Sequence, residues 1–547
     1  MSSAQPTRAD LRYGSIGALV QQAGRDHANA EALVDPETGQ RWTFSALASD
    51  VASAAAAFMA AGIQTGDRVA VWAPNIPEWV IAGLGALSAG GVLVPLNTRF
   101  KGSEAAFVLD KSGARILLCV NGFLGNDYVA ALRGSGIELP ALEHIVVLRG
   151  HVAESSPGRD GPEKAIAWNE FLAAGATVKR TEVDERIASL TSDDLSDIIF
   201  TSGTTGAPKG AMTTHGQTMR VFQNWGDTVG LRAGDRYLIV NPFFHTFGYK
   251  AGIVASLLQG ATIVPQAVFD VGQVLERVSA ERISMLPGPP TLFQSILEAP
   301  ARDTYDLSSL RLAVTGAAAV PVEMIRRMRE ELTFKTIVTG YGLTESTGTV
   351  SMCRHDDDPE TISQTSGRAI DDVEVKLVDV NGVEVSTGLP GEIWCRGYNV
   401  MRGYFNEPER TAETITPDGW LKTGDVGVMD ARGYLRITDR IKDMFIVGGF
   451  NAYPAEIEGA LLRYPGVAQA AVIGVPDARQ GEVGCAFLVP RGDAELKSDE
   501  VVAWCREQMA NYKVPRRVIV VASLPLNASG KVVKFELRER AAKLEAL

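Results

Sequence analysis

Short apolar runs alternate with longer apolar segments along the first part of the chain. One unit begins with "GDRVAVWAPN" (66–75), passes through a long apolar stretch and ends in "GVLVPLN" (91–97). A second begins with "DRYLIVNPFF" (235–244), passes through "GIVASLLQG" (252–260) and ends in "ATIVPQ" (261–266). Strands of about four to eight apolar residues that alternate with helical patterns are typical of βαβ units. The pattern therefore predicts parallel strands that are buried on both faces.

Further apolar runs of similar length predict more strands of the same kind. They are "RILLCV", "HIVVL", "DIIFTSG", "ISMLPGPP", "RLAVTGAA" and "TIVTGYG", several of which end in Gly, Ser, Thr or Pro. In open α/β sheets, ligands bind outside the carboxyl ends of the strands. We therefore expect a ligand site in the segments that follow these strands.

The pattern changes after about Gly367. "VEVKLVDVNGVEV", "GEIWCRG" and "GYLRITDR" predict short antiparallel strands, and Asn-Gly indicates a hairpin. From Lys442 onward, "AEIEGALLRYPGV", "AQAAVIGVPD", "EVGCAFLVP" and "SDEVVAWCREQM" predict a separate α+β domain. We predict an α/β protein with a large N-terminal domain of βαβ-type sheets and a small antiparallel β subdomain (1–441). A small, mobile α+β C-terminal domain (442–547) follows it.

Length and charge narrow the classes of function. A chain of 547 residues is too long for one hydrophobic core, because such cores stop growing at about 250–300 residues. The net charge of −12 argues against a general nucleic-acid binder, since that binding depends on Lys and Arg that neutralise phosphates. A locally basic pocket for a phosphorylated small molecule remains compatible with this charge.

Cysteine spacing and hydropathy argue against zinc-binding, disulfide-rich, secreted and membrane-spanning proteins. The five cysteines form no C-x-x-C pair, so the sequence predicts neither a zinc site nor a disulfide framework. The N-terminal "MSSAQPTRADLRYG" lacks the apolar region of a secretory signal. "WVIAGLGALSAGGVLVPL" is interrupted by glycines and a proline, which favours a buried helix followed by a strand over a membrane span. We therefore expect a cytoplasmic protein.

The stretch "TSGTTGAPKG" (201–210) combines the residue types that bind phosphate. Its glycines permit backbone N–H groups to point at one anion, and its hydroxyls and Lys209 add donors and a cation. It is not the G-x-x-x-x-G-K-[ST] loop, because Lys209 follows Pro208 and precedes Gly210. A solvated surface loop is the alternative, and the position directly after "DIIF" favours a ligand loop.

Four further stretches carry candidate chemistry: "GYGLTE" (340–345), "GWLKTGDVG" (419–427), "NPFFHTFGYKAG" (241–252) and "LPLNASGKVVK" (524–534). In the first, Tyr341 offers a flat face to a base, and Thr344 and Glu345 offer oxygens of the sort that hold Mg²⁺ beside a phosphate. In the second, Asp425 lies in a glycine-flanked turn and could accept two ribose hydroxyls.

Each of these stretches alone has a purely structural alternative. Tyr341 could pack at a turn, and Asp425 could merely form one. His245 follows a strand among aromatic residues, where a histidine is more often a packed residue than a base. Lys531 follows a glycine near the C-terminus, where a lysine is usually a solvated charge.

The order and spacing of the motifs resolve these alternatives. "TSGTTGAPKG", "GYGLTE", "TGD", "DRIKDMF", "GGFNAYPAEIE" and the final "GK" together resemble the adenylate-forming superfamily of acyl-CoA synthetases, adenylation domains and luciferases. The resemblance spans nearly the whole chain, from "WTFSAL" to "GKVVK". It implies an enzyme that joins a carboxylic acid to AMP and then transfers the acyl group to a thiol.

The resemblance also implies roles for residues of the N-terminal domain. ATP, Mg²⁺ and coenzyme A are the expected co-substrates and cofactor, with Thr201 and Glu345 at the metal and Tyr341 stacked on adenine. The residues expected to contact the nucleotide are Thr201, Ser202, Gly203, Thr204, Thr205, Gly206, Lys209, Gly316, Ala317, Ala318, Tyr341, Gly342, Thr344, Asp425 and Arg440. The expected acyl pocket contains His245, Tyr249, Lys250, Gly316 and Gly340, with His245 as a gate toward the thiol.

For the C-terminal domain the resemblance implies movement between two half-reactions. Lys531 would bridge the carboxylate and the α-phosphate during adenylation, which counters the charge that grows in the transition state. Lys442 occupies the hinge position. Rotation would then bring Gly448 and Gly449 to the site, where glycines leave room for a pantetheine arm. The catalytic residues expected overall are Lys531, Glu345, Thr201 and His245.

Two features favour coenzyme A as the acyl acceptor. The insertion typical of fatty acyl-AMP ligases is not apparent between Gly433 and Gly449, and the chain ends just past Lys531 rather than continuing into carrier modules. An adenylating enzyme that loads a carrier protein remains an alternative. Small molecules are the expected partners, with no nucleic acid and no membrane span, and a homodimer is one assembly that we consider.

The position of Lys250 bears on which carboxylic acid the enzyme activates. A cation facing an alkyl pocket is costly to bury without a partner, so Lys250 either points outward, pairs with an internal carboxylate, or meets a polar group on the acid or on coenzyme A. The stretches "NPFFHTFGYKAGI" and "LPGPPT" (286–291) resemble actinobacterial ligases that activate the bicyclic ketone-bearing propanoate left from steroid rings C and D. The alternative is a medium- or long-chain fatty acyl-CoA synthetase.

Overall fold

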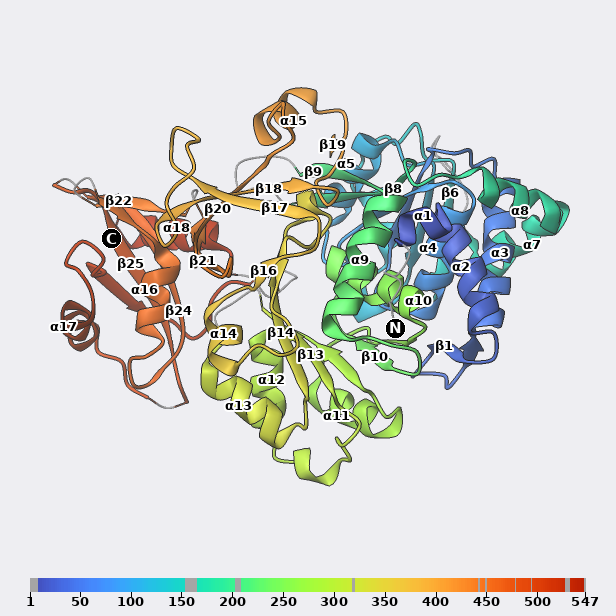
Figure 1. Ribbon diagram of the computed structural model, residues 1–547. Coiled ribbons are helices and arrows are strands. Elements are labelled where there is room, and N and C mark those ends of the chain that lie inside the picture. The colour runs from blue at the N-terminus through green and yellow to red at the C-terminus, as the bar shows by residue number, and fades with distance from the viewer. Residues whose placement is uncertain are drawn as a thin grey trace. The chain divides into compact units, whose positions relative to one another are not determined.

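The computed structural model describes residues 8–152, 165–201, 208–316, 320–440, 443–447, 450–477, 479–492, 494–526 and 532–545 (Figure 1). By its internal contacts the chain divides into two compact units. Unit 1 is residues 1–363, 369–374 and 396–421, and unit 2 is residues 364–368, 375–395 and 422–547. The domain boundary expected between 441 and 442 lies outside the described residues and stays a prediction.

Two sheets dominate unit 1. Within the described residues the larger sheet has nine strands, in the order β16 (Arg368–Ala369), β15 (Ser351–Met352), β14 (Thr336–Tyr341), β13 (Leu312–Thr315), β12 (Met285–Pro287), β10 (Arg236–Ile239), β11 (Thr262–Pro265), β1 (Glu31–Val34) and β2 (Arg41–Thr43). The other sheet has eight described strands, in the order β19 (Gly403–Tyr404), β9 (Lys209–Thr214), β8 (Leu195–Thr201), β4 (Val92–Pro95), β3 (Arg68–Trp72), β5 (Ile116–Val120), β6 (His144–Arg149) and β7 (Ala165–Ala167).

Both predicted βαβ units are confirmed. β3 pairs in parallel with β4, in the register Val69↔Leu93, and the helix α4 (Pro77–Ser88) connects them. β10 pairs in parallel with β11, in the register Tyr237↔Ile263. Their connection is a π-helix (Phe247–Val254) followed by α10 (Ala255–Gln259). Almost every residue of α4 is buried, which is expected of a helix that is apolar all round.

Asn75 joins the two sheets at the ends of their equivalent strands. It follows β3 in the smaller sheet and is buried, with 4% of its surface exposed. Its side-chain amide donates to the carbonyl oxygen of Ile239 (3.0 Å), the last residue of β10 in the larger sheet, and to that of Asn241 (2.9 Å), which follows β10. Its Oδ1 accepts from the backbone N–H of Phe243 at 2.8 Å. The two Pro-Asn and Asn-Pro strand ends of the sequence are therefore in direct contact.

The helices of unit 1 cover these sheets, and Figure 1 shows α11, α12 and α13 gathered around β13 and β14. Their bounds are α1 (Ala9–Tyr13), α2 (Ile16–Asp26), α3 (Phe44–Ala60), α5 (Gly102–Ser112), α6 (Tyr128–Gly134), α7 (Trp168–Ala174), α8 (Arg180–Ser189), α9 (His215–Val229), α11 (Val271–Ala280), α12 (Pro290–Leu297), α13 (Val322–Glu331), α14 (Pro359–Gln364) and α15 (Pro408–Thr414).

Unit 2 contains most of a four-stranded sheet and the α+β part predicted for the C-terminal end. The described four-stranded sheet has the order β17 (Val373–Val378), β18 (Pro390–Gly397), β20 (Leu421–Met429) and β21 (Leu435–Arg440). The α+β part has strands in the order β23 (Phe450–Ala452), β22 (Phe445–Val447), β25 (Gly481–Pro490) and β24 (Val467–Asp477), with β26 (Arg517–Val520) parallel to β25. Its helices are α16 (Pro454–Leu461), α17 (Ser498–Gln508) and α18 (Lys534–Glu545).

The Asn-Gly hairpin is present, with a shorter second arm than "NGVEV" predicted. The backbone N–H of Gly382 donates to the carbonyl of Asp379 at 3.0 Å, and Gly382 has a positive φ of 78°. Beyond the turn the second arm makes one antiparallel bridge, Val378↔Glu384, in place of a strand. The residues that follow are mostly exposed, so they bury too little surface to extend the pairing.

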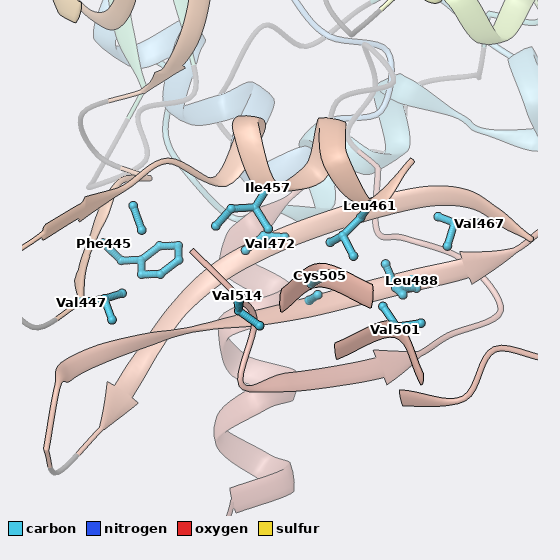
Figure 2. Close-up of a cluster of buried hydrophobic side chains, with 12 residues drawn as sticks. Phe445, Val447, Ile457, Leu461, Val467, Val472, Leu488, Val501, Cys505 and Val514 are labelled. Carbon is cyan, nitrogen blue, oxygen red and sulfur yellow. The ribbon is translucent and has the colours of Figure 1, made fainter. Parts of the chain in front are cut away.

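Two apolar clusters hold the α+β part of unit 2 together, and Figure 2 shows one of them. Side chains of α16 and α17 pack onto the strands β22, β24 and β25. The cluster consists of Phe445, Val447, Ala452, Ile457, Leu461, Val467, Val472, Ala486, Leu488, Val501, Cys505 and Val514. All five cysteines of the chain are buried. In the described residues, no helix is both long and apolar enough to cross a membrane.

Candidate active site

The segment predicted to bind phosphates closes the hairpin between β8 and β9 in unit 1. Thr201, the last residue of β8, is paired with Lys209, the first residue of β9. The Thr201 hydroxyl lies 3.5 Å from the carbonyl oxygen of Lys209. The structure therefore brings both ends of the loop together where the strand pair ends. The intervening loop residues Ser202, Gly203, Thr204, Thr205 and Gly206 lie outside the described residues.

Lys209 and Glu345 meet at one aromatic side chain, that of Tyr404. The ammonium nitrogen of Lys209 lies 4.8 Å from the centre of the Tyr404 ring. The phenol hydroxyl donates to Oε1 of Glu345 at 2.8 Å. Tyr404 itself is buried, with 5% of its surface exposed. The cation predicted for the phosphates and the carboxylate predicted for the metal thus lie at the same place.

No motif in the sequence marks Tyr404 as a candidate site residue. It lies in "MRGYFNEPER" (401–410), a stretch without metal-ligand spacing or a glycine-rich loop. A buried tyrosine usually finds a hydrogen-bond partner for its hydroxyl, so the burial of Tyr404 would have been the one usable signal. The partner depends on which segments pack together, and that is a tertiary property.

Gly316, Gly340 and Tyr341 gather at the carboxyl ends of the neighbouring parallel strands β13 and β14. A Cβ atom built on Gly316 would lie 3.5 Å from the carbonyl oxygen of Gly340. The two glycines are therefore adjacent, as predicted for a ligand site at strand ends. Tyr341 is the last residue of β14. Ala317 and Ala318 lie outside the described residues.

Thr344 and Glu345 lie in a 3₁₀ turn (Thr344–Ser346) directly after these residues. The carbonyl oxygen of Glu345 accepts from the backbone N–H of Met401 at 2.8 Å. Gly342 precedes the turn, and a Cβ atom there would lie 2.2 Å from the carbonyl oxygen of Gly348. Only glycine fits at this position without a shift of the backbone.

His245 lies between β10 and the π-helix Phe247–Val254. Its backbone N–H donates to the carbonyl of Pro242 at 3.0 Å, and its Nδ1 accepts from the backbone N–H of Phe247 at 3.3 Å. The residue is exposed. The structure thus orients His245 through the start of the π-helix, and its role as a gate stays a prediction.

The structure shows which group compensates the charge of Lys250. Its ammonium pairs with Oδ1 of Asp197 at 2.9 Å and donates to the hydroxyl of Thr213 at 2.6 Å. Burial lowers the pKa of Lys250, and the Asp197 carboxylate acts against this shift. The alternative that Lys250 pairs with an internal carboxylate is therefore confirmed.

The assignment of Lys250 and Tyr249 to the acyl pocket needs correction. Each has only 1% of its surface exposed, so neither presents a surface to a ligand. Tyr249 packs against Trp79, with ring centres 5.7 Å apart. The π-helix directs both side chains into the packed interior, and a run of apolar residues does not reveal that direction.

Asp425 and Arg440, predicted to bind ribose, are cross-strand partners in unit 2. They stand opposite each other in the antiparallel pair β20–β21. Asp425 is buried, with 3% exposed. Lys442, Gly448, Gly449 and Lys531 lie outside the described residues, so their predicted roles stay predictions.

The residues present fit a magnesium ion that arrives with a nucleotide. Among the described residues, no group of three or more His, Cys, Asp or Glu side chains could hold a metal ion. Mg²⁺, however, usually keeps several waters and binds one or two carboxylates together with substrate phosphates. The hydrogen bond from Tyr404 uses one of the acceptor sites of Glu345. A carboxylate has about four such sites, so capacity for a metal remains.

A separate cavity of about 920 Å³ opens on unit 1 beside α9, α15 and the segment before β19. Tyr404 lines it, as do Gln217 and Arg220. None of His245, Gly316, Gly340 or Tyr341 lines this cavity. The residues at the carboxyl ends of β13 and β14 therefore do not belong to this cavity.

Two family models match the chain. The one described as AMP-binding enzyme matches residues 20–405, and the one described as AMP-binding enzyme C-terminal domain matches residues 456–531. Together they contain every described candidate residue except Asp425 and Arg440.

Similar proteins and structures agree with these matches. A 3-[(3aS,4S,7aS)-7a-methyl-1,5-dioxo-octahydro-1H-inden-4-yl]propanoyl:CoA ligase of Rhodococcus jostii is 50% identical over 95% of this chain and 97% of its own length. The protein of the same name from Mycobacterium tuberculosis is 46% identical over 97% and 99%. An anthranilate CoA ligase in complex with anthranoyl-AMP superposes with a TM-score of 0.86 at 29% identity, covering 98% of both chains.

Proposed function

Because this chain belongs to the AMP-binding enzyme family, we propose that it is an ATP-dependent carboxylic acid:CoA ligase that works through an acyl-adenylate. In the first half-reaction a carboxylate oxygen attacks the α-phosphorus of ATP, and pyrophosphate leaves. In the second, the thiol of coenzyme A attacks the acyl carbon, and AMP leaves. The observation that carries the proposal is the meeting of Lys209 and Glu345 at Tyr404.

That arrangement suits nucleotide activation. In-line displacement at phosphorus depends mainly on positioning and on neutralising charge. Thr201 and Lys209 flank the loop that would hold the β- and γ-phosphates, and Glu345 would hold the metal ion. A bound Mg²⁺ would neutralise phosphate charge and make pyrophosphate a better leaving group.

The remaining roles follow the same proposal. Tyr341 would stack on adenine beside Gly316, and Thr344 would contact phosphate. Asp425 and Arg440 would bind the ribose hydroxyls. His245 would separate the acid from the entering thiol.

For the C-terminal residues we propose the roles that the family implies. Lys531 would bind the carboxylate and the α-phosphate during adenylation and would leave afterwards. Lys442 would act as the hinge of that movement. Gly448 and Gly449 would then border the pantetheine arm of coenzyme A.

For the acid, we propose the bicyclic, ketone-bearing propanoate named in the two ligases described above. Support comes from the identities of 50% and 46%, which extend over nearly the full length of all three chains. Lys250 no longer supports a polar acid, because its charge is neutralised internally by Asp197. Medium-chain acyl-CoA ligases are more distant, at 32% identity for the one from Macaca fascicularis, so the fatty-acid alternative is not favoured.

A screen of carboxylic acids tests both the proposed ligase activity and the proposed acid substrate. The enzyme is incubated with ATP, Mg²⁺ and coenzyme A together with the dioxo-indanyl propanoate, saturated fatty acids of several lengths, or anthranilate, and AMP and acyl-CoA are measured separately. We expect both products, with the highest kcat/KM for the bicyclic acid. AMP without any acyl-CoA would refute the ligase and favour transfer to a carrier protein. A preference for a fatty acid would refute the substrate alone.

A further inference from the structure

Tyr404 is held in place by backbone pairing on the strand that leaves the phosphate loop. β19 pairs antiparallel with β9, in the register Tyr404↔Ala211. The backbone N–H of Phe405 donates to the carbonyl of Gly210 at 2.8 Å. Figure 1 shows the two strands beside each other. Tyr404 is therefore fixed two register positions from Lys209, whatever the loop itself does.

The same segment also holds the backbone of Glu345. Met401 N–H donates to the carbonyl oxygen of Glu345 at 2.8 Å, while Tyr404 binds its carboxylate. The backbone N–H of Tyr404 donates to the hydroxyl of Thr411 at 2.9 Å, which ties β19 to α15. Main chain and side chain of Glu345 are thus both anchored to residues 401–404.

The geometry separates two opposite charges without neutralising them. Lys209 lies against the face of the Tyr404 ring, and Glu345 accepts from the hydroxyl. The face of an aromatic ring attracts a cation, and the phenol O–H is a donor to an anion, so one side chain accommodates both. In the described part of the chain, Lys209 and Glu345 form no ion pair with each other. Each charge therefore remains available to a ligand.

The hydrogen bond occupies only part of the Glu345 carboxylate. The Tyr404 hydroxyl donates to Oε1 of Glu345. A carboxylate has about four acceptor sites, so one Glu345 oxygen is fixed on the tyrosine and the remaining acceptor capacity is left for a ligand.

We infer that Tyr404 is a positioning residue for the metal–nucleotide complex: it orients Glu345 toward Mg²⁺ and holds Lys209 toward the phosphates. The inference rests on the proposed function, because Glu345 and Lys209 have these ligands only in an ATP-dependent enzyme. Tyr404 acts through the two charged residues and takes no part in bond making.

Binding of ATP in the presence and absence of Mg²⁺, measured by isothermal titration calorimetry, tests the inference without any turnover. Tyr404→Phe keeps the ring beside Lys209 and removes the donor to Glu345. We expect the dissociation constant for ATP with Mg²⁺ to rise about tenfold, as for loss of a hydrogen bond to a charged group, with little change in the absence of Mg²⁺. Tyr404→Leu also removes the ring and should weaken ATP binding under both conditions.

Tyr237→Phe is the matched control. Tyr237 is a fully buried tyrosine of β10 whose hydroxyl has no partner in the described part of the chain, so the same chemical change should leave both dissociation constants unaltered. In kinetics, Tyr404→Phe should raise the Mg²⁺ concentration for half-maximal adenylation and leave CoA transfer from pre-made acyl-adenylate intact.

The failure of the positioning role and the failure of the proposed function would give different results. If Tyr404→Phe binds ATP with an unchanged Mg²⁺ dependence, or loses both half-reactions equally, the positioning role is wrong. If the wild-type enzyme binds ATP with Mg²⁺ yet forms no acyl-CoA with any acid, the proposed function is wrong, and the binding data still decide the role of Tyr404.

Discussion

Gly342 occupies a position where a single added carbon atom would collide with the backbone. It lies between Tyr341 and the turn Thr344–Ser346, and a Cβ atom would be 2.2 Å from the carbonyl oxygen of Gly348. Two atoms cannot approach this closely, so any larger residue at this position must displace the backbone. The displaced segment carries residues that are predicted to contact the nucleotide.

Gly342→Ala is therefore expected to impair adenylation and to lower stability by about 1–3 kcal/mol, the range typical of overpacking. ATP–pyrophosphate exchange and thermal unfolding measure the two effects. Gly459→Ala in α16 is the control, because a Cβ atom there meets nothing within 4 Å. That variant should gain about 0.5–1 kcal/mol from helix propensity. Equal behaviour of the two variants would contradict the steric argument.

His215 is a buried histidine that the sequence did not mark. It begins α9, has 1% of its surface exposed, and its Nδ1 accepts from the backbone N–H of Ile16 at 3.3 Å. Burial lowers its pKa to about 4, and Asp197 and Asp194 act weakly against this shift. The imidazole therefore stays neutral in the folded protein while the unfolded chain takes up a proton below about pH 6.5.

The stabilising contribution of a neutral His215 is present above about pH 6.5 and is lost as the pH falls toward 4, because the unfolded state then binds more protons. Between pH 7 and pH 5 this loss is about 2 kcal/mol. Urea unfolding of the wild type and of His215→Asn at both values isolates the effect, since all other titrations are shared. Parallel loss of stability in the two proteins would show that His215 does not titrate as described.

At the scale of secondary-structure elements, Lys250 joins the π-helix to the hairpin that carries the phosphate loop. Its partner Asp197 lies on β8 and accepts from the hydroxyl of Thr213 on β9 at 2.7 Å. Ser196 donates to the other oxygen of Asp197 at 2.6 Å. Three elements thus share one buried, hydrogen-bonded ion pair.

Lys250→Met should leave the Asp197 carboxylate buried without its cation and lower stability by about 3–5 kcal/mol. Removing both charges in Lys250→Met/Asp197→Asn should restore most of this loss, because the amide oxygen can still accept from one of the two hydroxyls, Thr213 or Ser196, while the amide N–H donates to the other. Chemical denaturation of the single and double variants measures the difference. A double variant no more stable than Lys250→Met would show that the pair is not the unit of stability.

At the scale of the whole molecule, the predicted ligand residues divide between the two compact units. Thr201, Lys209 and Glu345 belong to unit 1, whereas Asp425 and the positions of Lys442 and Lys531 belong to unit 2. The proposed function assigns residues of both units to one nucleotide, so it predicts that variants in the two units differ in which half-reaction they impair.

Variants of unit 2 should therefore separate the half-reactions. Lys531→Ala is expected to lower adenylate formation by at least about a hundredfold, as for loss of a transition-state donor, and to spare thioester formation from pre-made acyl-adenylate. If Lys442 is the hinge, as proposed above, Lys442→Pro should show the opposite pattern, because proline restricts the backbone. Stopped-flow assays of each half-reaction provide the measurement. Equal loss of both half-reactions in Lys531→Ala, or normal turnover in Lys442→Pro, would contradict these roles.

The sequence by itself determined the strands, the βαβ units and the positions of the loops that follow them. These depend on local hydrophobic periodicity and on turn residues, as in "GDRVAVWAPN" and "DRYLIVNPFF". Such local signals can be recognised in the sequence without knowledge of the tertiary structure. Its motifs also identified the family, because their order is a property of the chain and not of its packing.

Only the tertiary structure decided which side chains meet. Periodicity could not show that Asn75 joins two sheets, that Lys250 turns inward to Asp197, or that Tyr404 lies between Lys209 and Glu345. Each of these contacts joins segments distant in sequence, and its geometry is set by strand register and by the direction of a π-helix. Burial then makes such contacts consequential, because a polar group removed from water must find its partner within the protein.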